Sequence, residues 1–188
     1  MKKLVLALTI ICASVLTSNA QWTPGDFKFG IGLRAALPIG DMHNVSSFGL
    51  GGEVQGEYAF AENLTGVVTS GYTRFFGKSF DDGLGDTYKT NYGHIPVLVG
   101  ARFYPSEQFF VGAQIGYGHY SGSTSYSGNG VSGSGGSGST GGFEYRPQIG
   151  YNADPVQLIF SYDGTAVSGG TFSHLGLSIL YTFGGGSK

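Results

Sequence analysis

Cysteine, long apolar runs and clustered positive charge are all scarce in this 188-residue chain. The single cysteine, Cys12, lies within the first 20 residues, so the rest of the chain can form no disulfide bond. No later segment holds 18 consecutive apolar residues, which excludes a membrane-spanning helix there. The 10 lysines and arginines, against 12 acidic residues, form no cluster that would grip phosphates. We therefore expect no nucleic-acid partner.

The first 20 residues have the order of a secretory signal peptide. Lys2 and Lys3 precede an apolar stretch from Leu4 to Leu16, and small or polar residues follow up to Ala20. The apolar stretch is too short to span a membrane as a helix. We predict export with cleavage after Ala20, which leaves residues 21–188 as one domain.

Apolar and polar residues alternate along most of the remaining chain. A strand needs this pattern when one face meets hydrocarbon and the other faces a polar lumen. The segment 174–183 shows it best, with Leu180 as the one exception. In 64–76 the pattern is weakest, because Val67 and Val68 are adjacent and Arg74 falls on the apolar register; a bulge or a rim position would explain this. The predicted strands are 27–37, 48–60, 64–76, 94–103, 109–117, 143–151, 156–162 and 174–183.

The connections between these strands alternate in length. Short polar turns are expected at 61–63, 105–108 and 152–155, and long segments at 77–91, 119–142 and 164–173. Short periplasmic turns and longer extracellular loops are typical of an all-β, eight-stranded antiparallel transmembrane up-and-down β-barrel, which is the fold we predict. The Gly- and Ser-rich segment 121–142 is expected to be a mobile solvent loop. Two interfacial girdles are expected from Phe60, Tyr104 and Phe109 at the turns and Tyr72, Tyr117 and Tyr162 towards the loops.

Four segments carry a resemblance to a known family: Phe29-Gly-Ile-Gly-Leu-Arg, His94-Ile-Pro-Val-Leu-Val-Gly-Ala-Arg-Phe-Tyr, Phe110-Val-Gly-Ala-Gln-Ile-Gly-Tyr and Leu177-Ser-Ile-Leu-Tyr-Thr-Phe. The chain resembles the small outer membrane β-barrel proteins described as porin-family or OmpA-like barrels. The resemblance implies a place in a Gram-negative cell outer membrane. It also implies that the closing aromatics Tyr181 and Phe183 act as the insertion signal read by the outer-membrane assembly machinery, although five residues follow them.

Charged residues on the inward register predict a network that fills the lumen. An eight-stranded barrel is just wide enough for its own side chains. Four basic residues face four acidic ones there, and unpaired charges in so confined a space would be costly. We therefore expect a plugged lumen and a structural or surface-interaction role, with a small diffusion pore as one alternative. The expected network is Lys28, Arg34, Arg102, Arg146, Glu53, Glu57, Glu144 and Asp163.

A second alternative is a hydrolase that modifies lipid A. His119 and Ser121 lie two apart on a strand, which places an imidazole and a hydroxyl on one face. The pair is similar to the His-x-Ser motif of outer-membrane lipid A deacylases and would supply base and nucleophile. Gly122 stands where that family has Asn, however, and the nearest acid, Glu144, falls on the inward register. Our main hypothesis is therefore that the protein is not an enzyme.

Other motifs indicate no cofactor or metal. Gly30-Ile-Gly-Leu-Arg-Ala has the glycine spacing of a dinucleotide loop, but the strand alternation runs through it and no helix follows. The four histidines show no short metal-ligand spacing. The expected partners are outer membrane lipid and, during insertion, the assembly machinery; the chain is expected to be a monomer.

Overall fold

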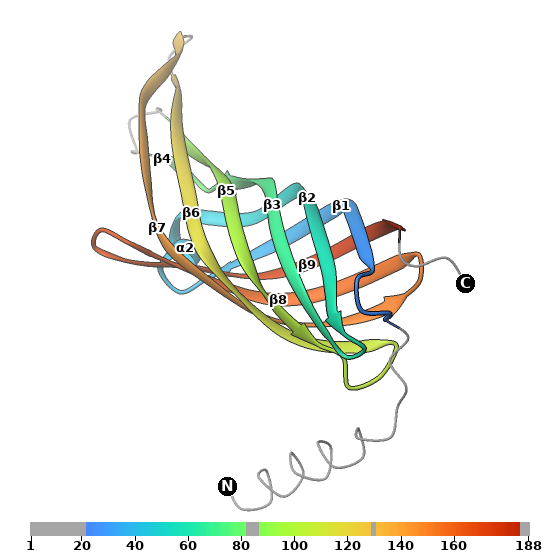
Figure 1. Cartoon of the computed structure of the whole chain (residues 1–188). Coiled ribbons are helices and arrows are strands. Elements are labelled where there is room, and N and C mark those ends of the chain that lie inside the picture. The colour runs from blue at the N-terminus through green and yellow to red at the C-terminus, as the bar shows by residue number, and fades with distance from the viewer. Residues whose placement is uncertain (1–21, 82–86, 129–130, 185–188) are drawn as a thin grey trace, which may run out of the picture.

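The computed structural model describes residues 22–81, 87–128 and 131–184. Eight long strands and the three-residue β4 make up the sheet in this part of the chain (Figure 1). The strands are β1 (Phe27–Ile39), β2 (Ser46–Ala61), β3 (Leu64–Gly77), β4 (Ser79–Asp81), β5 (Thr87–Phe103), β6 (Phe109–Gly128), β7 (Val131–Ala153), β8 (Val156–Val167) and β9 (Gly170–Gly184).

Every long strand pairs antiparallel with two neighbours, so the sheet closes into an up-and-down barrel. Neighbouring long strands pair along the chain, with β3 pairing to β5 past the short β4, and β1 pairs with β9 to close the ring. The β1–β9 register runs without a shift from Lys28 opposite Gly184 to Ile39 opposite Ser173. Closure matters because an open edge within a bilayer would leave backbone N–H and C=O groups without partners.

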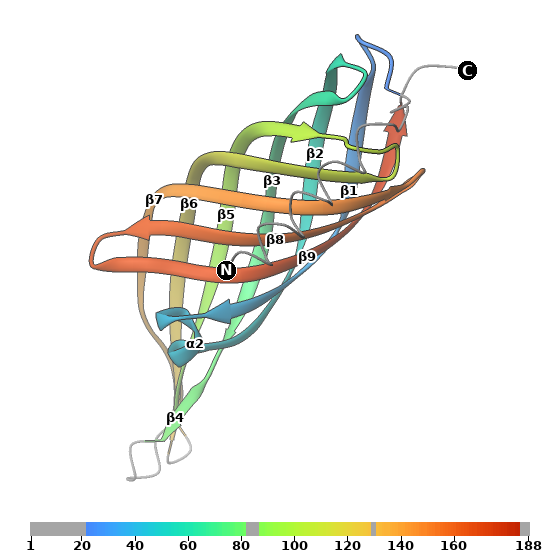
Figure 2. The same ribbon diagram turned by 90° about the horizontal axis from the view of Figure 1, so that it is seen from below.

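The two ends of the barrel differ. The start of β1, the end of β9 and the short turns after β2, β5 and β7 gather at one end, here called the turn end (Figures 1 and 2). At the other end, here called the ribbon end, lie β4 and the helix α2 (Asp41–Val45). No helix in the described part of the chain is long and apolar enough to cross a membrane.

The outer wall is a continuous apolar surface. Outward side chains remain exposed along each long strand, with Leu33 at 75% and Phe60 at 62%. So large an exposed apolar surface is stable only against another apolar phase. On β6 the apolar outward positions run from Phe109 to Tyr117, about the nine to eleven residues that cross a bilayer's hydrocarbon core.

The strand with the weakest alternation, β3, has no bulge beside its adjacent valines, Val67 and Val68. Val67 is buried and Val68 exposed, and the β2–β3 register shifts only near its ends, between Ser46 and Phe48 and between Ala59 and Ala61. Val67 is thus an apolar residue on the inward face. Arg74 points outward near the ribbon end, which is the rim position that the sequence allowed.

Two expectations about the strand ends are wrong. The segment 164–173 is not a long loop, because β8 and β9 continue through it to a tight turn at Ser168 and Gly169, where Gly169 has a φ of 96°. Tyr104 does not join an outer girdle. It lies one residue beyond β5, is 1% exposed, and turns into the barrel because its hydroxyl binds the buried Glu57.

The long connection expected at 119–142, with its mobile loop at 121–142, also differs in the structure. Its described residues continue β6 and β7 as a paired hairpin, and β5 pairs with β6 as far as Thr87 opposite Ser127. Residues 87–93, 118–128 and 131–142 thus form a three-stranded extension, here called the ribbon, that rises past the other strands (Figure 1). Composition suggested a linker because the ribbon buries little apolar surface, but backbone pairing continues from the barrel strands and needs no large side chains.

The outer part of the ribbon should be dispensable for barrel folding. Ser123 and Ser137 are cross-strand partners, so residues 124–136 can be replaced by a two-residue Asn-Gly turn that suits a hairpin. The shortened and full-length proteins should show the same shift in gel mobility on heating, because a closed barrel stays folded in detergent until boiled. Loss of that shift in the shortened protein alone would mean that the ribbon takes part in folding.

Candidate functional site

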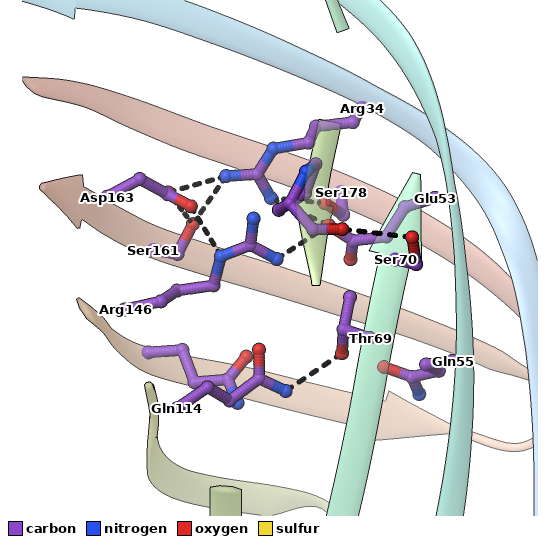
Figure 3. A network of polar contacts seen from close by, with 12 residues as sticks. Arg34, Glu53, Gln55, Thr69, Ser70, Gln114, Arg146, Ser161, Asp163 and Ser178 are labelled. Atoms are coloured by element: carbon purple, nitrogen blue, oxygen red, sulfur yellow. Dashed lines mark hydrogen bonds and ion pairs between the residues drawn. The ribbon is translucent and has the colours of Figure 1, made fainter. Parts of the chain in front are cut away.

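Two arginines and two carboxylates form a cluster at the centre of the lumen (Figure 3). Arg34 Nη1 lies 3.1 Å from Glu53 Oε2, and Arg34 Nη2 lies 2.5 Å from Asp163 Oδ2. Arg146 Nη1 lies 2.8 Å from the same Glu53 oxygen, and Arg146 Nε donates to Asp163 Oδ1. Each of the two carboxylates therefore contacts both guanidinium groups. All four side chains are 3% exposed or less, so these are desolvated, charge-assisted contacts.

Small residues around Arg34 make room for its guanidinium. Ser161 and Ser178 each accept a hydrogen bond from it at 3.0 Å. A methyl group added at Gly176 would overlap the guanidinium itself. These small inward residues therefore leave the space that the large Arg34 side chain, which comes from another strand, occupies.

A second polar group, centred on Arg102 and Glu57, lies towards the turn end. Arg102 Nη1 lies 2.9 Å from Glu57 Oε2, and Arg102 Nη2 donates to Gln55 Oε1 at 2.9 Å. Burial and the Glu57 carboxylate raise the pKa of Tyr104, just beyond β5, well above its ordinary value. Its hydroxyl therefore keeps its proton and donates to Glu57 Oε1 at 2.6 Å. Arg102 also lies 4.4 Å above the centre of the Phe110 ring.

A third group lies towards the ribbon end and contains two histidines. His94 Nε2 is 2.8 Å from Glu144 Oε2, which also accepts a hydrogen bond from Thr165 at 3.1 Å. The His94 ring stacks on Tyr120, with centroids 4.3 Å apart and an interplanar angle of 16°. His174 Nε2 lies 3.8 Å from Asp163, so the histidines adjoin the central cluster.

Apolar clusters lie at both ends of the lumen, and sequence reasoning missed them. Leu180, the exception to the alternation, is fully buried, as are inward residues at the mouth such as Phe75. Apolar residues at inward positions near the strand ends were the sequence signal that could have indicated these clusters. The turn-end cluster is Trp22, Ala59, Tyr104, Phe110, Ile159 and Leu180. The ribbon-end cluster is Ala36, Met42 of α2, Phe75 and Tyr120, with Tyr92 and Phe172 packed against it.

The structure gathers seven of the eight residues expected in the lumen into these three groups. They are Arg34, Glu53, Glu57, Arg102, Glu144, Arg146 and Asp163. The eighth, Lys28, lies at the turn-end rim instead, where its Nζ is 3.5 Å from Asp154 and 4.8 Å above the Trp22 ring. Three arginines thus face four carboxylates, and the carboxylate farthest from an arginine, Glu144, has His94 as its partner.

The other expected residues lie on the outer wall. Tyr181 and Phe183 are exposed on β9 with ring centroids 4.8 Å apart, and their role in insertion remains a prediction. His119 and Ser121 share the outward face of β6, but no hydrogen bond joins them in the described chain. Glu144 is on the other side of the wall, bound to His94. Among the described residues, no three His, Cys, Asp or Glu side chains are placed to hold a metal ion.

A closed antiparallel barrel with an apolar outer wall and a polar, charged interior defines a transmembrane β-barrel. The chain belongs to the outer membrane protein beta-barrel domain family, whose match spans residues 4–183. No curated protein sequence matches it.

Solved structures agree on the fold. Ail, the attachment invasion locus protein of Yersinia pestis, has a TM-score of 0.59 and 18% identity, with 86% of this chain and 100% of Ail covered. Its complex with the heparin analogue sucrose octasulfate has a TM-score of 0.60 at the same identity and coverage. The N-terminal barrel domain of Pseudomonas aeruginosa OprF has a TM-score of 0.48 and 11% identity, with 85% and 99% covered. At 18% identity the likeness to Ail shows the fold alone.

Removing one arginine from the central cluster should strongly destabilise the barrel. We expect Arg34→Met to lower the free energy of unfolding by about 3–5 kcal/mol, because it leaves buried carboxylates short of a partner. Lys28→Met is the matched control. It removes only the rim ion pair with the exposed Asp154, and this loss should lower the free energy of unfolding by about 1 kcal/mol or less. Urea unfolding in lipid vesicles measures both. Equal effects of the two substitutions would contradict the buried network.

Proposed function

We propose that this protein is a non-conducting, non-enzymatic outer membrane barrel that acts through the surface it presents outside the cell. The observation that carries the proposal is the contact between Glu53 and Arg146. Their strands, β2 and β7, are four places apart around a ring of eight, so this bond spans the lumen from wall to wall.

Contacts at other heights along the barrel axis also support a closed lumen. Arg102 on β5 reaches Gln157 on β8, and Gln55 on β2 reaches the same Gln157 oxygen at 2.7 Å. Apolar clusters lie beyond the polar groups at both ends. A solute would have to separate paired charges in a water-poor space, and this argues against the diffusion-pore alternative.

The ribbon supports a role at the cell surface. Beyond Tyr117 the outward positions of β6 pass from apolar residues to His119, Ser121 and Ser123, which suit water rather than hydrocarbon. With the short turns on the periplasmic side, as is usual for such barrels, the ribbon stands outside the cell. In this proposal the chain is exported by its signal peptide and inserted by the assembly machinery through Tyr181 and Phe183. It then resides as a monomer among outer membrane lipids.

The outer wall near the ribbon does not favour hydrolysis. A serine nucleophile needs a base in hydrogen-bond reach and a third group that orients the base. His119 and Ser121 offer the residue types without these contacts, and Glu144 is committed to His94 inside the barrel.

Purified protein should show no stable open channel in planar bilayers. Currents are expected to be absent, or small and intermittent, because brief exchange of ion-pair partners opens no lasting path. Detergent micelles without protein, in the same buffer, give the background current. Large, long-lived single-channel steps that scale with protein concentration would refute the closed lumen.

The lipid A profile should not depend on this protein. Mass spectrometry of lipid A from cells that express the unaltered chain, the Ser121→Ala variant or neither should give one pattern. A deacylated species that appears with the unaltered chain and disappears with Ser121→Ala would establish the hydrolase instead.

A further inference from the structure

A cavity of about 290 Å³ lies above the closed lumen, between the ribbon and the barrel mouth. Its lining comes from the inward face of β5, β6 and β7 and from Phe172 on β9. Its volume is at the small end of the range for ligand sites, roughly 300–1,000 Å³, and suits one or two small rings.

Aromatic side chains form the floor of this cavity: the partly buried Tyr92 and Phe172 expose ring surface to it, and the buried Tyr120, 1% exposed, packs against them. Tyr120 and Phe172 meet edge to face, with centroids 5.2 Å apart at 81°. Tyr120 is held from below by its stack on His94, and Tyr92 packs beside it against the same cluster. The floor is therefore rigid before any ligand arrives, which lowers the entropic cost of binding.

Glycines and hydroxyls form the walls. Gly122, Gly136 and Gly138 leave the backbone of β6 and β7 bare along the cavity, and a Cβ added at Gly136 or Gly138 would meet no atom within 4 Å. Thr90 and Thr124, which lie 2.9 Å apart through their hydroxyls, stand among these glycines. Thr140 adds another hydroxyl from the inward face of β7. A hydroxyl both donates and accepts hydrogen bonds, so the walls can match a partner rich in hydroxyls.

None of the described residues that line the cavity carries a charge. Phosphate, sulfate and carboxylate ligands would lose water there without gaining an ion pair, which is costly. A sugar ring fits the remaining chemistry, because its C–H face packs on the electron-rich face of an aromatic ring while its edge offers hydroxyls. We propose that this cavity binds an uncharged saccharide of one or two rings. The proposal rests on the surface role proposed above and names the class of ligand for it.

The test uses the full mature chain, refolded into detergent free of lipopolysaccharide. A panel of neutral oligosaccharides, including maltose, cellobiose and chitobiose, is screened beside the polysaccharide released from the host's own lipopolysaccharide. Sucrose octasulfate serves as the charged probe. Binding by at least one neutral sugar of the panel is expected. If the released polysaccharide binds as well, the cell's own envelope is a source of the ligand.

Gly138→Val decides where the sugar binds. A Cβ atom at this position would meet no atom within 4 Å, and the inward register of Gly138 directs it towards the cavity. Affinity should therefore fall roughly tenfold or more while the barrel stays folded. Ser123→Val, on the exposed outward face of the same ribbon, is the matched control and should bind as before. The heat-induced gel shift checks folding of both variants.

Three results would overturn the assignment: no neutral sugar binds, Gly138→Val binds as well as the unaltered chain, or only sucrose octasulfate binds. None of them bears on the closed lumen, which bilayer conductance tests separately.

Discussion

Backbone pairing in a medium without water is the constraint on which this structure depends. Each strand must pair on both edges, so the sheet closes through β1–β9 and β3–β5. Closure at eight strands then fixes a narrow lumen, and the two-residue period of a strand sends alternate side chains to lipid and to the interior. The apolar wall and the polar interior are therefore two consequences of one constraint.

Inside so narrow a barrel, charge and size must be matched between strands. Arg34 occupies space left free by Gly176, and its two guanidinium nitrogens meet carboxylates from β2 and β8. Replacing a single member leaves the others buried and short of a partner, so residues far apart in the sequence depend on one another. The same contacts that join distant strands also occupy the space between them.

The ribbon extends the barrel's pairing beyond the apolar band. Its outward positions are small and polar, whereas its inward positions leave a cavity floored by Tyr120 and Phe172. Tyr120 lines this cavity and also stacks on His94, which is one of the polar residues in the lumen. The interior network thereby supports the shape of the outer surface, which makes the lumen a scaffold for the ribbon end.

Alternation and turn composition are local properties of each strand. They were therefore enough to predict the closed eight-stranded barrel, the outward apolar residues and seven of the inward charges from the amino-acid sequence. Which charges meet depends on the folded chain. Glu53 and Arg146 are 93 residues apart, and their contact depends on the register of strands on opposite sides of the ring. The same holds for Lys28 at the rim, for Leu180 in the turn-end cluster and for the paired ribbon: each depends on neighbours that the local pattern does not contain.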